Sequence, residues 1–151
     1  MIAVNTVDTL SNRTRKRLVV IPDASPVIQA ARLLTQTDTS LVVVCNPSGQ
    51  IAGVVTKADV VREISTCTGC SCTAMVSDVM TRDVKTCQPE QSLLDVWDIM
   101  KTNSLKQIPV RDQESRPLGV LYANDALETL LNQVEQDELL LRDYVMGIGY
   151  R

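Results

Sequence analysis

An internal repeat constrains the fold of this 151-residue chain more than any other feature of its sequence. When the sequence is shifted by 66 residues, residues 22–65 align with the second half of the chain without a gap. The apolar run Val42–Val44 then falls on Ile108–Val110, and Gly53–Val55 falls on Gly119–Leu121. Self-similarity at a fixed period indicates a duplicated structural unit. Because neither copy is large enough to bury a sheet well alone, we expect the two copies to pack against each other.

Each copy has the pattern of a strand, a helix, two strands joined by a hairpin turn, and a second helix. In the first copy, Leu41–Cys45 is a continuous apolar run, which is typical of a strand buried on both faces. Asn46–Gly49 predicts the hairpin turn, and Ile51–Val55 predicts the returning strand. Ser25 is expected to cap the first helix, with Pro26 at its first position. The pattern predicts an α/β fold.

The second copy carries stronger helix signals. Ser92 and Asp95 are spaced as in a capping box, which predicts a helix start at this point. A long final helix is predicted from Asp125 toward Met146. Its expected apolar stripe, at helical spacing, consists of Leu127, Leu131, Val134, Leu141 and Val145.

The composition excludes several classes of function. The chain has no His, which removes the commonest general base and the commonest metal ligand, so we expect no catalysis and no catalytic cofactor. A net charge of −3 disfavours binding to nucleic acid or to an anionic membrane. No apolar run approaches the roughly 20 residues of a membrane span, and residues 1–10 lack a signal-peptide core. We therefore expect a cytoplasmic protein with reduced cysteines.

The stretch Gly53–Asp59 carries the most specific chemical information in the sequence. It places the Thr56 hydroxyl and the Asp59 carboxylate three residues apart, where a strand ends and a helix begins. A helix N-terminus attracts phosphate, and an ionised carboxylate can accept hydrogen bonds from both hydroxyls of a ribose. Thr and Asp are also ordinary residues at helix starts. The recurrence of the Asp as Asp125 in the second copy favours a binding role over simple capping.

These residues resemble the CBS-domain pair, also called the Bateman module. The family motif is Gly, two apolar residues, Thr or Ser, two variable residues and Asp, and Gly53, Thr56 and Asp59 match it. Val79–Val84 resembles the entry to a family repeat, and Gln107–Val110 resembles its second strand. The resemblance implies two tandem CBS repeats (β-α-β-β-α) packed as one pseudo-twofold module. The implied divisions are a first repeat at 7–65, a cysteine-containing linker at 66–76, a second repeat at 77–132 and a C-terminal helical tail at 133–151.

The resemblance also implies a regulatory, non-catalytic module with ligand clefts between its repeats. Family members bind AMP, ADP or ATP, and some bind NAD or S-adenosylmethionine. By position, the first cleft would consist of Val54, Thr56, Asp59, Met80, Asp83, Lys85, Leu105 and Lys106. The second cleft, expected to bind more weakly because Tyr122 replaces Thr or Ser, would consist of Arg17, Val19, Thr39, Ser40, Val120, Tyr122 and Asp125.

Partners and assembly follow from the same resemblance. Isolated CBS pairs commonly dimerise, so we expect a homodimer in which the final helix is a candidate dimer element. The module would report the adenine nucleotide level, as an energy sensor, to a regulated protein that the sequence does not identify. A purely structural dimerisation unit with clefts that bind nothing is an alternative.

A cysteine-rich loop between the copies supports another alternative. Cys67, Cys70 and Cys72 are a dense set of soft ligands or a redox-active group, so the chain is alternatively a thiol-responsive or metal-responsive sensor. A metal site needs about four ligands, and this loop offers three. Cys45 and Cys87, in predicted strands, are expected to be small core residues.

Overall fold

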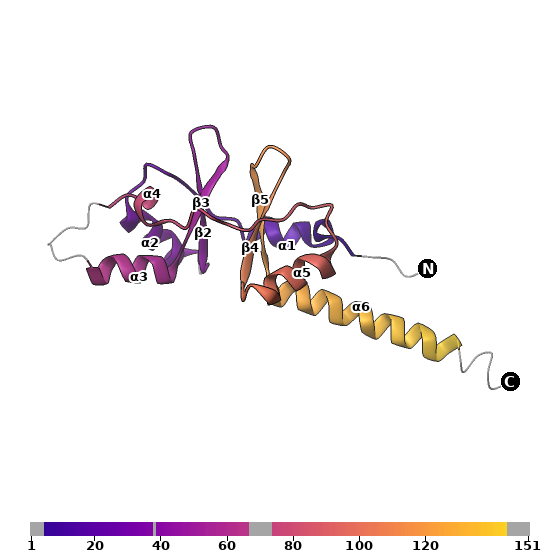
Figure 1. The fold of residues 1–151 in the computed structure, drawn as a ribbon. Helices are drawn as coiled ribbons and strands as arrows, with labels where there is room; N and C mark the ends of the chain where they lie inside the picture. The colour runs from indigo at the N-terminus through magenta and orange to yellow at the C-terminus, as the bar shows by residue number, and fades with distance from the viewer. Residues whose placement is uncertain (1–4, 38, 67–73, 145–151) are drawn as a thin grey trace.

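The computed structural model describes residues 5–37, 39–66 and 74–144, which form two α/β halves side by side (Figure 1). The hairpins of the two halves meet in the middle, and helices cover their outer sides. In chain order the elements are η1 (Val7–Leu10), α1 (Ser11–Lys16), β1 (Val20–Pro22), α2 (Val27–Gln36), β2 (Leu41–Cys45), β3 (Ile51–Thr56), α3 (Lys57–Thr66), α4 (Val76–Val79), α5 (Leu93–Thr102), β4 (Gln107–Arg111), β5 (Pro117–Tyr122) and α6 (Ala123–Tyr144).

The strand pairing in the two sheets confirms the predicted duplication. In the first half, β2 lies between the parallel strand β1 and the antiparallel strand β3. The pairing of Leu41 with Thr56 recurs, 66 residues later, as the pairing of Gln107 with Tyr122. The second half lacks a full counterpart of β1 and has one parallel bridge from Cys87 to Val110 instead. Both hairpins also have an irregularity in strand register at equivalent positions. The two copies therefore have the same strand pairing, including its irregularity.

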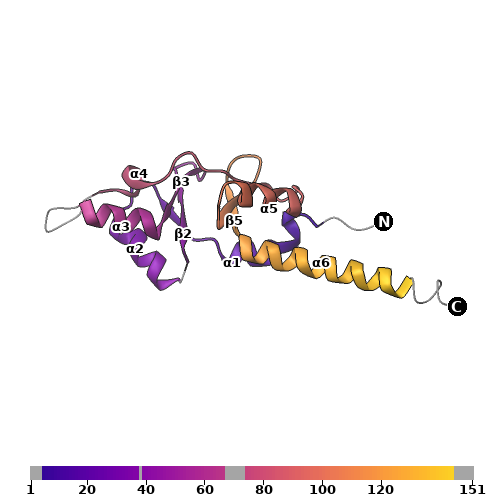
Figure 2. The same ribbon diagram turned by 60° about the horizontal axis from the view of Figure 1, so that its bottom comes forward.

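The entry segments of the two repeats are exchanged in space. Val7 and Leu10, from the first repeat, belong to the hydrophobic core that Leu93 and Ile108 form in the second half. Val76 from α4 belongs to the core of the first half. Figures 1 and 2 both show α1 beside β5 and α6, and α4 beside α2 and α3. This exchange makes each half depend on the other for its core, and it produces the pseudo-twofold module that the resemblance implies.

A third apolar cluster joins the two sheets at the centre of the molecule. Its buried members are Leu41, Val43, Cys45 and Val54 from the first sheet, with Val120 from the second. The hairpin tips are also joined, because the Ile51 N–H donates to the Ser115 carbonyl at 2.8 Å. The two repeats are therefore packed together at the centre and hydrogen-bonded at the hairpin tips.

Of two predicted helix starts, the one at Ser25 is wrong and the one at Ser92 is confirmed. Helix α2 begins at Val27, with Pro26 at the N-cap position, and the Ser25 side chain makes no cap hydrogen bond there. The Ser25 carbonyl instead accepts a hydrogen bond from the Val76 N–H, because this segment pairs with the entry segment of the second repeat. Helix α5 begins where predicted, with Ser92 as its N-cap residue, although the Ser92 side chain makes no cap hydrogen bond. Both helices are fixed by packing of their apolar faces rather than by their caps.

The predicted apolar stripe of α6 faces away from the core. Leu131 is 53% exposed and Val134 is 60% exposed. Ala126 and Leu130 face the core instead, because the side of α6 that meets α5 is fixed by the end of β5. Figure 2 shows α6 extending well beyond the two sheets. The side chains of Leu141 and Val145 lie outside the residues described.

Candidate functional site

The end of β3 and the start of α3 hold Thr56 and Asp59 together. The Asp59 Oδ2 atom accepts hydrogen bonds from the Thr56 N–H at 3.0 Å and from the Thr56 hydroxyl at 3.1 Å. The Asp59 N–H donates to the Thr56 Oγ1 atom at 3.3 Å, which completes a reciprocal capping arrangement. The Asp59 Oδ1 atom lies 3.5 Å from the Arg62 guanidinium. These bonds orient the Thr56 side chain and keep Asp59 buried behind it.

A cleft of about 530 Å³ opens beside Thr56, between the two repeats. Six of the eight residues predicted for this cleft line it: Val54, Thr56, Asp83, Lys85, Leu105 and Lys106. The other two do not reach it. Asp59 lies behind Thr56, and Met80 is buried against Gly53 in the core of the first half. Residues that the sequence reasoning missed also line it, namely Leu41, Thr81, Val84, Asn103, Ser104, Gln107 and Pro109.

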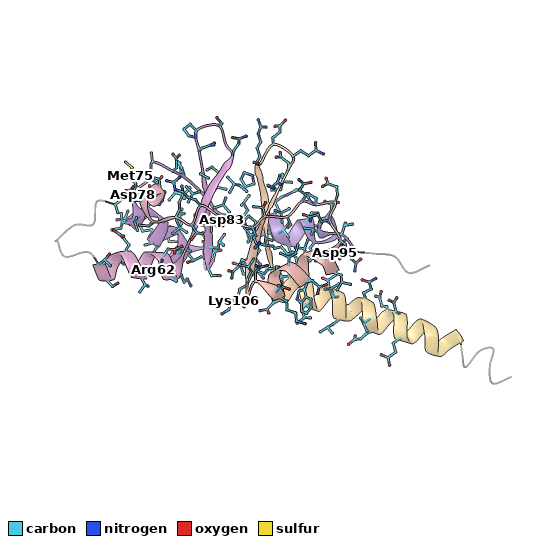
Figure 3. The ribbon with its side chains drawn as sticks, viewed as in Figure 1. Arg62, Met75, Asp78, Asp83, Asp95 and Lys106 are labelled. Carbon is cyan, nitrogen blue, oxygen red and sulfur yellow. The ribbon has the colours of Figure 1, made fainter. Side chains whose placement is uncertain are left out.

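The walls of this cleft are fixed by pairing between β3 and the entry segment of the second repeat. The Val54 N–H donates to the Thr81 carbonyl at 3.0 Å, and the Thr81 N–H donates back to the Val54 carbonyl at 2.9 Å. Gly53 permits this approach, since a Cβ atom there would lie 2.6 Å from the Thr81 carbonyl oxygen. Asp83 lies between the two halves, and Lys106 lies just before β4 (Figure 3). The cleft thus combines apolar walls with cations and a carboxylate.

Residues predicted for the second cleft form an ion pair between the repeats. The Arg17 guanidinium donates to both carboxylate oxygens of Asp125, over distances of 3.3 to 3.4 Å. It also lies over the Tyr122 ring, 4.2 Å from the ring centroid, which is a cation–π contact. Arg13 adds a weaker contact to Asp125 at 3.7 Å. Three of the predicted second-site residues are therefore brought together, and they bind one another.

The Tyr122 hydroxyl makes its contacts across the repeat boundary. It lies 3.1 Å from the Thr39 hydroxyl. Burial raises the pKa of Tyr122, but hydrogen bonds with Thr39 and Ser40 and the charge of Arg17 lower it, and the net effect is a pKa below the usual value. Ser40 also accepts a hydrogen bond from the Gln107 side chain at 2.8 Å. Val120 is buried between the sheets, and Val19 packs against the core of the first half.

The cysteines divide into two groups. Cys67, Cys70 and Cys72 lie outside the residues described, so a role for them in metal or redox sensing stays a prediction. Cys45 and Cys87 are buried core residues, as expected. Burial raises the pKa of Cys87 to about 12 despite the nearby Arg111 charge, so this thiol is protonated at neutral pH. Among the described residues, no group of three or more His, Cys, Asp or Glu side chains is arranged to hold a metal ion.

The fold and the cleft define a class: a tandem-repeat α/β module with a polar cleft between its repeats. The family model for the CBS domain matches the chain twice, at residues 10–66 and 76–132. The chain belongs to the CBS-domain family, which confirms the resemblance drawn from its motifs. Within the described residues, no helix is long and apolar enough to cross a membrane, and the expected cytoplasmic location stays a prediction.

Known proteins resemble the chain over most of its length. The CBS domain-containing protein CBSX3, mitochondrial, of Arabidopsis thaliana is 28% identical over 82% of this chain, but the match spans only 61% of that relative. The crystal structure of CBSX2 in complex with AMP superimposes with a TM-score of 0.71 at 20% identity, covering 85% of this chain and 97% of the other. The CBS-domain pair of MJ0100, solved with 5′-methylthioadenosine and S-adenosyl-L-methionine, gives 0.72 at 17% identity, covering 86% and 98%.

Proposed function

We propose that this chain is a regulatory, non-catalytic module that binds an adenine nucleotide in the cleft beside Thr56. The observation that carries the proposal is the composition of that cleft. Its lining comes from both repeats and combines the Thr56 hydroxyl with two lysines, Lys85 and Lys106, and with apolar walls. A nucleotide needs each of these groups, because its base is apolar on both faces, its ribose carries hydroxyls and its phosphates are anions.

The ligands of two structural relatives support the choice of an adenine compound. CBSX2 was solved with AMP, and the MJ0100 domain pair was solved with 5′-methylthioadenosine and S-adenosyl-L-methionine. All three ligands contain adenosine, whereas their other parts differ. We therefore propose that the cleft binds the adenosine portion and that the groups around it choose among AMP, ADP, ATP, NAD and S-adenosylmethionine.

Each part of the ligand has a proposed partner in the cleft. The base would lie against the apolar side chains of Val54 and Leu105. The ribose hydroxyls would bond to Thr56, with Asp59 one hydrogen bond behind it. The phosphates would approach Lys85 and Lys106, which are paired with no carboxylate among the described residues. Phosphate binding by an ammonium group depends on charge rather than on a fixed geometry, so two flexible lysines are sufficient.

Binding in this cleft would act on the relation between the repeats. The ligand would touch both halves, whose other contacts include the apolar cluster around Val43 and Val120 and the hydrogen-bonded hairpin tips. A ligand shifts a conformational equilibrium by its difference in affinity for the two states. We propose that the nucleotide favours one angle between the halves and that a partner protein recognises it.

Calorimetric titration with AMP, ADP, ATP, NAD and S-adenosylmethionine tests the function. We expect saturable binding of at least one adenine compound, and weaker phosphate-dependent binding in Lys85→Ala and Lys106→Ala. Lys16→Ala is the matched control, because Lys16 is an exposed lysine on α1 and does not line the cleft. Adenosine should bind all three variants alike. No binding by any of these compounds would exclude the proposal, and would favour a purely structural dimerisation unit.

We also propose that the module is a homodimer, because equivalent surfaces of the two repeats are apolar. Ile28 on α2 and Leu94 on α5 occupy repeat-equivalent positions, and both are exposed. Val61 on α3 and Leu127 on α6 form a second such pair. An apolar face that recurs by pseudo-symmetry, on helices at the outside of both halves, is well placed to contact a second copy of the chain.

A further inference from the structure

The two clefts carry opposite charges at one pair of equivalent positions, Arg17 and Asp83. The shift of 66 residues that relates the strands places Arg17 on Asp83, and it places Asp59 on Asp125. The second cleft therefore has a cation facing its motif carboxylate. The first cleft has a carboxylate at the same position. Opposite charges attract across the second cleft, whereas Asp83 and Asp59 are both carboxylates and cannot form an ion pair between the repeats.

A local insertion explains how Arg17 reaches Asp125. The first repeat has four more residues than the second between its entry segment and its first strand. These residues are accommodated in α1, whereas the equivalent segment after α4 contains no helix. Helix α1 packs closely on β5, since a Cβ atom at Gly119 would lie 2.6 Å from the Thr14 backbone. The end of this helix projects Arg17 over Tyr122 and toward Asp125.

The contacts of Arg17 use the groups that a ligand would need in this cleft. Its guanidinium bonds to both oxygens of Asp125, which a ribose would otherwise occupy. It also covers one face of Tyr122, on which a base would otherwise stack. The Asp125 side chain is only 13% exposed, so its charge requires a partner, and Arg17 supplies it. The first cleft differs, because the partner of Asp59 is Arg62, which comes from the same helix and does not cross between the repeats.

We infer that Arg17 is an intramolecular latch that closes the second cleft by occupying Asp125 and Tyr122, which leaves one adenine-nucleotide site per chain. The inference rests on the proposed function of the first cleft. It goes beyond a weak second site, because the cleft is closed by a specific ion pair and not only by the size of Tyr122. Removing the latch, and restoring Thr in place of Tyr122, would therefore open a second site.

The number of AMP molecules bound per chain tests the latch. AMP is the suitable probe, because the second cleft has Val19 and Ser40 at the positions of Lys85 and Lys106 and so offers little charge to a polyphosphate. We expect one AMP per wild-type chain and two per Arg17→Ala/Tyr122→Thr chain. The control Arg15→Ala, a neighbouring exposed arginine on α1, should keep one. Two sites in the wild-type protein, or an unchanged number in the double variant, would overturn the inference.

Failure of the proposed function gives a different result. If the wild-type chain binds none of the five adenine compounds, the proposed function is wrong, and the latch is judged by AMP binding to the double variant alone. One new site there would support it, and none would overturn it. A ligand-free measurement uses Arg17→Ala, in which Asp125 keeps the Arg13 contact. The pKa of Tyr122, followed by tyrosinate absorbance, should rise when Arg17 is removed, and an unchanged pKa would contradict the latch.

Discussion

The hydroxyl groups of Thr39 and Tyr122 lie 3.1 Å apart and join the first repeat to the second. Tyr122 occupies the position that Thr56 has in the first repeat. The longer side chain carries its hydroxyl across the boundary between the repeats, whereas the Thr56 hydroxyl stays with Asp59 on its own side. One substitution in a duplicated motif thus replaces a group available to a ligand with a bond between the halves.

The lowered pKa of Tyr122 predicts how stability changes at alkaline pH. Because this pKa is lower in the folded chain than in the unfolded chain, the unfolded state binds more protons between the two values. Tyr122 should therefore add no ionisation-linked stability near pH 7, and its contribution should grow as the pH rises toward the usual tyrosine pKa of about 10. The measurement is the free energy of urea unfolding of the wild-type protein minus that of Tyr122→Phe, at both pH values.

A control separates this effect from the titration of other groups. Lysines also titrate in the same range, so only the difference between wild type and variant is informative. A wild-type advantage over Tyr122→Phe that shrinks as the pH rises would show that the Tyr122 pKa is raised in the folded state.

Two equivalent glycines predict different effects on the two clefts. A Cβ atom at Gly53 would lie 2.6 Å from the Thr81 carbonyl oxygen, and one at Gly119 would lie 2.6 Å from the Thr14 backbone. Either Gly→Ala change should destabilise the fold by about 1–3 kcal/mol, since the neighbouring backbone must move. Gly53→Ala displaces the segment that carries Asp83 and Lys85, so it should also weaken nucleotide binding in calorimetry. Gly119→Ala is the matched control, and equal losses of affinity in both would contradict a single site.

The hairpin turns predict a stabilising change. Ser115 has a φ of 66°, and its equivalent in the first repeat is Gly49, with a φ of 83°. A side chain in this left-handed region costs roughly 1 kcal/mol, which glycine avoids. Ser115→Gly should therefore raise the free energy of unfolding by about 0.5–1 kcal/mol in urea titrations. Ser48→Gly is the control, because Ser48 has no positive φ, and it should be neutral or destabilising. An equal increase in the free energy of unfolding from both variants would show that the positive φ of Ser115 is not the cause.

The sequence alone predicted the parts of the fold that repeat. The alignment of Leu41–Cys45 with Gln107–Arg111 required the same strand pairing twice, and the structure has it. The cap at Ser25 failed because a capping residue reports a local preference, whereas tertiary packing fixes where α2 begins; the helix start at Ser92 was predicted correctly. The sequence predicted that Leu127, Leu131 and Val134 of α6 would face the core, but they are exposed. Helical spacing shows that these apolar residues share one face, and it does not show what that face contacts.

The candidate site was predictable where the motif supplied it. The resemblance identified Thr56, Lys85 and Lys106, which the structure places around one cleft. The Arg17–Asp125 ion pair was not foreseen, although both residues were assigned to the second site, because a list of positions does not show which side chains bond to one another. Asn103 and Ser104 were missed because they lie in the loop after α5, outside any motif. A comparison of the equivalent residues Arg17 and Asp83 would have shown that the two clefts carry opposite charges at this position.

The exposed apolar face of the outer helices predicts that two single changes disrupt the homodimer. Val61 is 64% exposed on α3, and Leu131 is 53% exposed on α6. If this face is buried against a second copy, each side chain contributes about 1.5–3 kcal/mol to association, so a buried Glu should weaken the dimer at least tenfold, or about 1.4 kcal/mol. Sedimentation equilibrium should detect a dimer for the wild type and monomers at the same concentration for Val61→Glu and Leu131→Glu. Gln113→Glu, an exposed change of the same charge on the β4–β5 hairpin, should stay dimeric. A wild-type monomer, or variants that remain dimeric, would show that this face is not a dimer interface.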